Sequence, residues 1–358
     1  MLAYIVRRLL LMVPTLFGIL LINFLIIQAA PGGPVERTLA KLQGIGGSAL
    51  GGGGDIVQAA AHGPGGYRGS QGLDPTLIAE IEKQYGFDQP PATRFWHMIN
   101  DFLHFDLGQS FYRDIPVLDL VLEKMPVSLS LGLWSTLLIY LIAIPLGIRK
   151  ALAPGGRFDV WSSGVIIVAY AIPGFLFALL LIIVFAGGSY WQWFPMQGLV
   201  SDNFAELAPW RQVLDYAHHL VLPTLCLTLG GLATLTLFTR NSFLEELGKQ
   251  YVLTARAKGA SERRVLLGHV FRNAMLILIA GLPATLFGIL FTGTFLIEII
   301  FNLDGLGLLS YESVINRDYP VIFGTLFLFT LMGMVLRLAG DLCYRLVDPR
   351  IDFERAAT

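Results

Sequence analysis

Residues Leu9–Ala30 are LLLMVPTLFGILLINFLIIQAA, a run that contains no charged side chain. About 20 apolar residues are enough to cross the hydrocarbon core of a bilayer as a helix. Arg7 and Arg8 precede the run, as they would in a signal peptide. However, the run is longer than the apolar core of a cleavable signal, and further apolar segments follow it. We therefore expect a retained membrane helix.

Five more long apolar runs follow, at about 127–148, 160–186, 219–239, 274–300 and 321–344. Only helices satisfy the backbone polar groups of such runs within lipid. The composition agrees, because 54% of the residues are hydrophobic and 14% are charged. The predicted fold class is an all-α polytopic membrane protein with six transmembrane helices and a large periplasmic segment between the first two. Prolines within five of the runs predict kinked helices.

The distribution of Lys and Arg predicts the orientation in the membrane. Basic residues are concentrated in alternate connections, whereas the two short connections of the opposite side contain only Arg211 and Arg317. We therefore expect a multi-pass protein of the bacterial inner membrane with both termini in the cytoplasm. The predicted segments are 1–30 (N-terminus and first helix), 31–126 (periplasmic), 127–346 (helices two to six, with a cytoplasmic loop at 240–273) and 347–358 (cytoplasmic tail).

The periplasmic segment has two halves of different composition. Residues 44–72 are rich in glycine and have little apolar surface, so we expect a flexible loop. Residues 74–126 are expected to be helical. Asp74 and Pro75 are suited to the start of one helix, and Phe95, Ile99 and Phe102 indicate a second.

The cytoplasmic loop carries the most information about function. Gly259 is suited to the left-handed conformation that ends a helix, and Ser261 can cap a second helix that starts at Glu262. Small side chains before Gly259 would let the first helix enter a groove, and the basic side chains would favour an acidic surface. An ordinary positively charged inner loop explains the charge equally well, and the residues alone leave both interpretations open.

Thr254-Ala255-Arg256-Ala257-Lys258-Gly259, with His269-Val270-Phe271-Arg272-Asn273 downstream, resembles the coupling loop of ABC importer permeases of the dipeptide/oligopeptide branch. In that family the loop docks into a groove of the ATPase subunit. Leu253 departs from the wider permease family, which has a glutamate there. The resemblance assigns ATPase coupling to Tyr251, Thr254, Ala255, Arg256, Ala257, Lys258, Gly259, Ser261, Glu262 and Arg263.

Other motifs extend the resemblance over almost the whole chain. They include Asp106-Leu107-Gly108-Gln109-Ser110, Arg317-Asp318-Tyr319-Pro320 and Asp348-Pro349-Arg350. Arg157-Phe158-Asp159 and Ala30-Pro31-Gly32-Gly33 resemble the Yej-type importers within that branch. This resemblance implies oligopeptide cargo, including microcin C. It also implies a second homologous permease, a fused double ATPase that holds ATP and Mg²⁺, a periplasmic peptide-binding protein and membrane lipid as partners.

Three ionisable residues lie within or near the apolar runs. Glu298 could line a pathway or accept hydrogen bonds from the Gly305–Gly307 turn, and Arg337 and Asp341 are spaced to pair on one helix face. We expect structural roles for all three. No nucleophile with a base, P-loop or metal-ligand pattern is evident, so we expect no catalysis, cofactor, metal or nucleic acid in this chain.

Two other function classes compete with an ABC permease. An ion-coupled secondary transporter of small solutes would need ionisable groups near the bilayer centre and preferably an internal repeat. Neither is clear in the sequence. An assembly factor without transport activity would lack ATPase partners.

Overall fold

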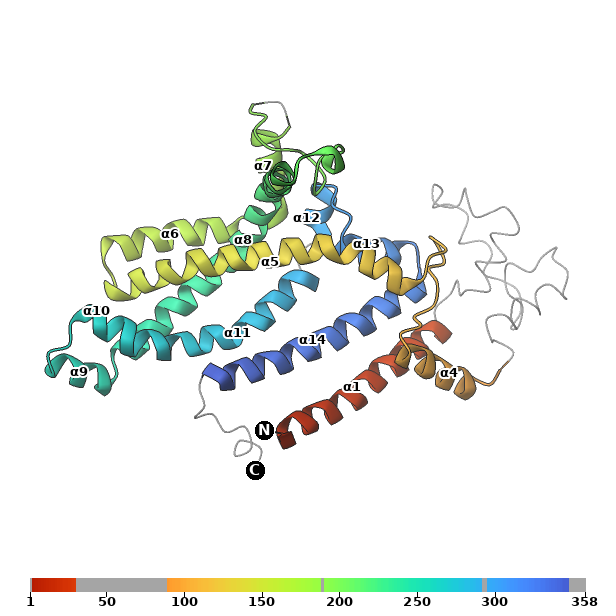
Figure 1. Cartoon of the computed structure of the whole chain (residues 1–358), viewed down its shortest axis with the longest axis horizontal. Coiled ribbons are helices and arrows are strands. Elements are labelled where there is room, and N and C mark those ends of the chain that lie inside the picture. Colours follow the sequence, from red (N-terminus) through yellow and green to blue (C-terminus); the bar gives the residue numbers. More distant parts are fainter. Residues whose placement is uncertain (1, 30–88, 188–189, 292–294, 348–358) are drawn as a thin grey trace, which may run out of the picture. The chain divides into compact units, whose positions relative to one another are not determined.

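The computed structural model describes residues 2–29, 89–187, 190–291 and 295–347, and these residues are almost entirely helical. No named β-strand occurs among them (Figure 1). The glycine-rich stretch 44–72, the helix predicted at Asp74 and the tail from 348 lie outside the described residues. The α-helices are α1 (Leu2–Ala29), α4 (Pro91–Leu103), α5 (Val117–Leu152), α6 (Arg157–Ala171), α7 (Gly174–Phe185), α8 (Pro209–Leu247), α9 (Gln250–Ala257), α10 (Glu262–Val265), α11 (Phe271–Phe291), α12 (Phe295–Ile300), α13 (Leu306–Ile315) and α14 (Tyr319–Val347). A short 3-10 helix, η2 (Phe204–Glu206), precedes α8, and a π-helix, η3 (Leu266–Val270), joins α10 to α11.

Five stretches of the described helices are long and apolar enough to cross a membrane, and a sixth span results if α6 and α7 count as one. They overlap the six runs expected from the sequence. The helices extend beyond those runs at both ends of α5 and α8, because polar residues there continue the helix outside the apolar stretch. The helix indicated by Phe95, Ile99 and Phe102 is α4, but residues 104–116 form turns rather than helix.

The third span is broken rather than kinked. Helices α6 and α7 meet at an angle of 93° across Ile172 and Pro173. Proline has no N–H to continue the helix, and its ring pushes the preceding residue out of the helical region. Ile172 accordingly has φ −81° and ψ 119°. Pro14, Pro145, Pro223 and Pro283, by contrast, lie inside continuous helices.

The chain forms two compact units. The first comprises residues 1–10, 120–312 and 328–358. In it α8 packs against α6, α7 and α11 (Figure 1). Gly147 of α5 lies so close to Thr239 of α8 that an added Cβ would be 2.6 Å from the threonine Cβ. Small residues allow membrane helices to approach in this way.

The second unit comprises residues 11–119 and 313–327. The ring of Phe95 in α4 contacts the rings of Phe17 and Phe24 in α1, with centroids 5.5 and 5.3 Å apart. Ser110 donates a hydrogen bond of 2.5 Å to the buried carboxylate of Asp318. Two motifs that are separate in the sequence therefore form one contact.

Candidate functional site

The 240–273 segment contains a tight corner between α9 and α10. Gly259 has φ +80°, as expected for the left-handed residue that ends a helix. The N–H of Ala260 bonds to the carbonyl of Ala255 at 3.1 Å, and the N–H of Gly259 bonds to that of Arg256 at 2.9 Å. These are the two hydrogen bonds of a Schellman motif. The corner is thus an ordered structure that depends on a glycine conformation.

The second helix begins at Glu262, as expected, but Ser261 does not make the expected capping hydrogen bond. Ser261 has extended backbone angles and its carbonyl accepts from Val265 N, whereas its hydroxyl makes no capping bond. Glu262 instead forms a two-pronged ion pair with Arg256, with nitrogen–oxygen distances of 2.8 and 3.0 Å. This pair links the two sides of the corner and raises the pKa of Arg256.

One face of the corner is buried against the membrane helices. Val252 of α9 and Val265 of α10 join a core cluster with Phe243, Val270 and Ala274. This packing places the corner against the C-terminal end of α8 and the N-terminal end of α11.

Other side chains of α9, α10 and the turn after α10 are exposed, and two of them are leucines. Leu253 is 55% exposed and Leu267 is 53% exposed. Eight of the ten predicted coupling residues are exposed, and Tyr251 and Ala255 are half-buried. The exposed ones are Thr254, Arg256, Ala257, Lys258, Gly259, Ser261, Glu262 and Arg263.

A polar contact ties α9 back to α8. Glu246, in the last turn of α8, accepts a hydrogen bond of 2.6 Å from the Tyr251 hydroxyl and also pairs with Lys249. Burial, and secondly the bond to Glu246, raise the pKa of the Tyr251 phenol. The bond to Glu246 likewise raises the pKa of Lys249.

A buried ionic cluster lies at the start of the same segment, and sequence reasoning missed it. The fully buried Lys150 approaches Asp159 at 3.1 Å, and Arg240 holds the same carboxylate at 3.0 and 2.7 Å. Lys150 also donates to Ser162 and Ser163. The cluster joins α5, α6 and α8. These basic residues entered the sequence analysis only through the charge bias, although the polar spacing of 159, 162 and 163 indicates one inward helix face.

Glu298 has a structural environment. It is fully buried and accepts hydrogen bonds from Ser128 Oγ at 3.1 Å and from Leu308 N at 2.7 Å. A Cβ on Gly305 would lie 2.7 Å from the Glu298 carboxylate. The carboxylate therefore binds the backbone just after the Gly305–Gly307 turn, where hydrogen bonds from the turn itself were expected.

The partner of Asp341 differs from the expected one. Its carboxylate pairs with Arg8 of α1 at 3.1 Å and accepts a hydrogen bond of 2.7 Å from Tyr4. Arg337 is exposed, and no ion pair joins it to Asp341 in the described part of the chain. Spacing along one helix permits a pair, but here a neighbouring helix supplies a closer cation.

Comparison with known proteins identifies the family. Residues 143–353 match the family described as binding-protein-dependent transport system inner membrane component. The chain belongs to this family. It is 58% identical to the "Peptidoglycan transport system permease protein YejB" of Agrobacterium fabrum, over 99% of each chain. It is 56% identical to the "Inner membrane ABC transporter permease protein YejB" of Escherichia coli, over 98% of this chain and 99% of the relative.

More distant relatives include the "Oligopeptide transport system permease protein AppB" of Bacillus subtilis, 33% identical over 99% of this chain and all of the relative. Among solved structures, the inward-facing methionine ABC transporter MetNI aligns over 64% of this chain and 97% of the other, with 17% identity and a TM-score of 0.48. The chain is a non-catalytic permease subunit of a peptide-type ABC importer, and ATP hydrolysis occurs in a separate subunit. The family implies an ATPase, a substrate-binding protein and a second permease as partners.

Proposed function

We propose that this permease forms half of a translocation pathway for oligopeptides and that the α9–α10 corner couples the pathway to ATP hydrolysis. The observation that carries the proposal is the corner itself. It is ordered by the Gly259 conformation and packed on α8 and α11, and Leu253 and Leu267 beside it are exposed. An ordinary charged loop needs neither the order nor the exposed leucines.

The proposed mechanism is alternating access driven from outside the chain. A periplasmic binding protein delivers peptide, and ATP with Mg²⁺ closes the ATPase subunits. The exposed leucines hold the corner in the ATPase groove. Because the buried face of the corner is packed on α8 and α11, closure of the ATPase tilts both helices. The second permease supplies the other wall of the pathway.

The proposed cargo and setting follow the relatives and the charge bias. Peptides are the cargo named for AppB, and the Agrobacterium fabrum relative is named for peptidoglycan transport. We propose peptides, including peptidoglycan-derived peptides and microcin C, and a fused double ATPase as the motor. The excess of Lys and Arg in alternate connections supports an inner-membrane protein with cytoplasmic termini and contact with anionic lipid.

The proposal predicts that charge on the exposed leucines uncouples the complex. Purified complex that carries Leu253→Asp and Leu267→Asp should retain less than about a tenth of the wild-type ATPase subunit, because two apolar contacts of a docking surface are replaced by charge. Leu103→Asp is the matched control, since Leu103 is 67% exposed in α4. Full ATPase retention by the double variant would refute docking through this face.

Uptake into proteoliposomes separates the competing function classes. The wild-type complex with its binding protein should accumulate labelled tripeptide only when ATP is enclosed on the ATPase side. Uptake that survives without ATP but stops when the proton gradient is dissipated would instead indicate an ion-coupled transporter.

A further inference from the structure

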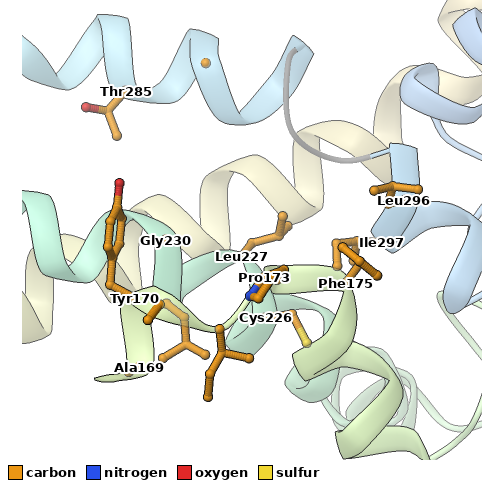
Figure 2. Close-up of a pocket in the computed structure, with 15 residues that line it drawn as sticks. Ala169, Tyr170, Pro173, Phe175, Cys226, Leu227, Gly230, Thr285, Leu296 and Ile297 are labelled. Atoms are coloured by element: carbon orange, nitrogen blue, oxygen red, sulfur yellow. The ribbon is translucent and has the colours of Figure 1, made fainter. Parts of the chain in front are cut away.

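The break in the third span forms one wall of a cavity of about 700 Å³. Residues 169–175 supply that wall, and α8, α11 and α12 supply the others, all within the first compact unit. Figure 2 shows Tyr170 extending toward the part of α11 that carries Thr285, with Cys226 and Leu227 of α8 beside the break. The volume falls in the range of ligand pockets, about 300–1,000 Å³.

The broken helix leaves backbone acceptors at this cavity. The last carbonyls of a helix have no partner within it, and Pro173 has no N–H to offer. The N–H of Ile172 bonds weakly to Ala169 O, at 3.4 Å. In the described part of the chain, no hydrogen bond reaches the carbonyls of Tyr170, Ala171 or Ile172. Such backbone at membrane depth is tolerated where it is buried in protein or lines a water-filled cavity, whose water a ligand can replace as the donor.

The remaining lining defines the chemistry of the ligand. None of the lining residues is charged, and the side chains of Tyr170, Phe175, Leu227 and Leu296 are largely apolar. A charged ligand group would lose its hydration there without an ionic partner. A ligand with apolar side chains and N–H donors matches both the walls and the free carbonyls. A segment of peptide backbone has this combination.

We propose that the cavity is a peptide-binding subsite of the permease. One apolar side chain of the cargo lies against Tyr170 and Phe175, and the backbone N–H groups of the cargo bond to the carbonyls of residues 170–172. The subsite rests on the proposed function, because it presupposes that peptide passes along this chain. It would favour apolar side chains and accept different sequences, since backbone groups make the hydrogen bonds.

Gly230 provides a way to fill the cavity. It lines the cavity from α8, and an added Cβ would have no atom within 4 Å. Gly230→Phe should therefore raise the KM for a trileucine peptide about tenfold, while that for trialanine changes much less, as expected when a hydrophobic pocket loses volume. Gly164→Phe is the matched control: Gly164 also faces open space on α6 but does not line the cavity. Equal KM changes for both peptides, or none, would overturn the subsite.

A crosslinking experiment tests contact directly and separates this inference from the proposed function. Benzoylphenylalanine replaces Leu227 in the assembled complex, which is irradiated with labelled trileucine in lipid vesicles. Crosslinks to peptide that unlabelled trileucine suppresses are expected, with none from the same probe at Gly164. Crosslinks to lipid alone would overturn the subsite. If the wild-type complex imports trileucine with ATP but no peptide crosslink forms, only the subsite is refuted. If the wild-type complex imports neither trileucine nor trialanine, the proposed function is contradicted.

Discussion

Replacement of Gly259 by alanine tests the role of the corner most sharply. An L-residue in the left-handed conformation is disfavoured by roughly 1–2 kcal/mol. Because a Cβ at Gly259 would meet no atom within 4 Å, this conformational term is the whole cost. A penalty of this size shifts the balance between the formed and opened corner about 5–30-fold. The Schellman hydrogen bonds at Ala260 and Gly259 and the Arg256–Glu262 pair would then hold the corner in a smaller fraction of complexes.

The measurement is the number of peptides imported per ATP hydrolysed, in proteoliposomes that contain the whole complex. We expect this ratio to fall several-fold in Gly259→Ala, with normal assembly and basal hydrolysis. Gly268→Ala is the matched control. A Cβ at Gly268 would also meet no atom within 4 Å, but Gly268 does not have a positive φ. If both variants keep the wild-type ratio, the corner does not transmit the motion of the ATPase.

Two further predictions concern the ionic contacts. Asp159→Asn leaves the fully buried Lys150 without its carboxylate and should destabilise the permease by about 3 kcal/mol, the lower end of the usual range because two serines still bind the ammonium. Thermal unfolding in detergent measures this, and Arg157→Gln, which removes an exposed charge at the start of α6, should change little. A double-mutant cycle between Arg8 and Asp341 should give a coupling of about 0.2–1 kcal/mol, as for partly exposed pairs. The same cycle between Arg337 and Asp341 should give no coupling energy. A coupling energy larger than that of Arg8 with Asp341 would contradict the observed pairing.

Local patterns predicted the features that depend on local physics. The apolar runs predicted the membrane spans, because each segment that crosses lipid must satisfy its own backbone hydrogen bonds as a helix. Gly259 gave the corner, because few residues adopt its backbone conformation without strain. Pro173 was one of five prolines expected to kink a helix, and the span is broken there. The sequence pattern did not distinguish this proline from the four that lie within continuous helices, and it gave no bend angle, which is 93°.

Pairings between distant segments could not be predicted in the same way. Ser110 and Asp318 are 208 positions apart, and nothing in either motif names the other as its partner. Lys150 counted toward the predicted orientation, but the charge bias does not distinguish a solvated lysine from a fully buried one. Asp341 shows the opposite failure, since a favourable spacing to Arg337 was available and the structure uses Arg8 instead. Side-chain spacing limits which pairs are possible, and helix packing selects among them.

The ionic cluster adds a mechanical step to the proposed coupling. Arg240 lies on α8, against whose last turns the corner packs. Its two bonds to Asp159 attach α8 to α6. Helix α6 leads in turn to the break at Ile172, where the cavity lies. A tilt of α8 imposed at the corner would therefore reach the cavity through a rigid ionic joint as well as through apolar packing. Arg240→Lys should keep the positive charge but lose the two-pronged bond to Asp159, because lysine cannot bind a carboxylate through two nitrogens. We expect it to lower the number of peptides imported per ATP hydrolysed.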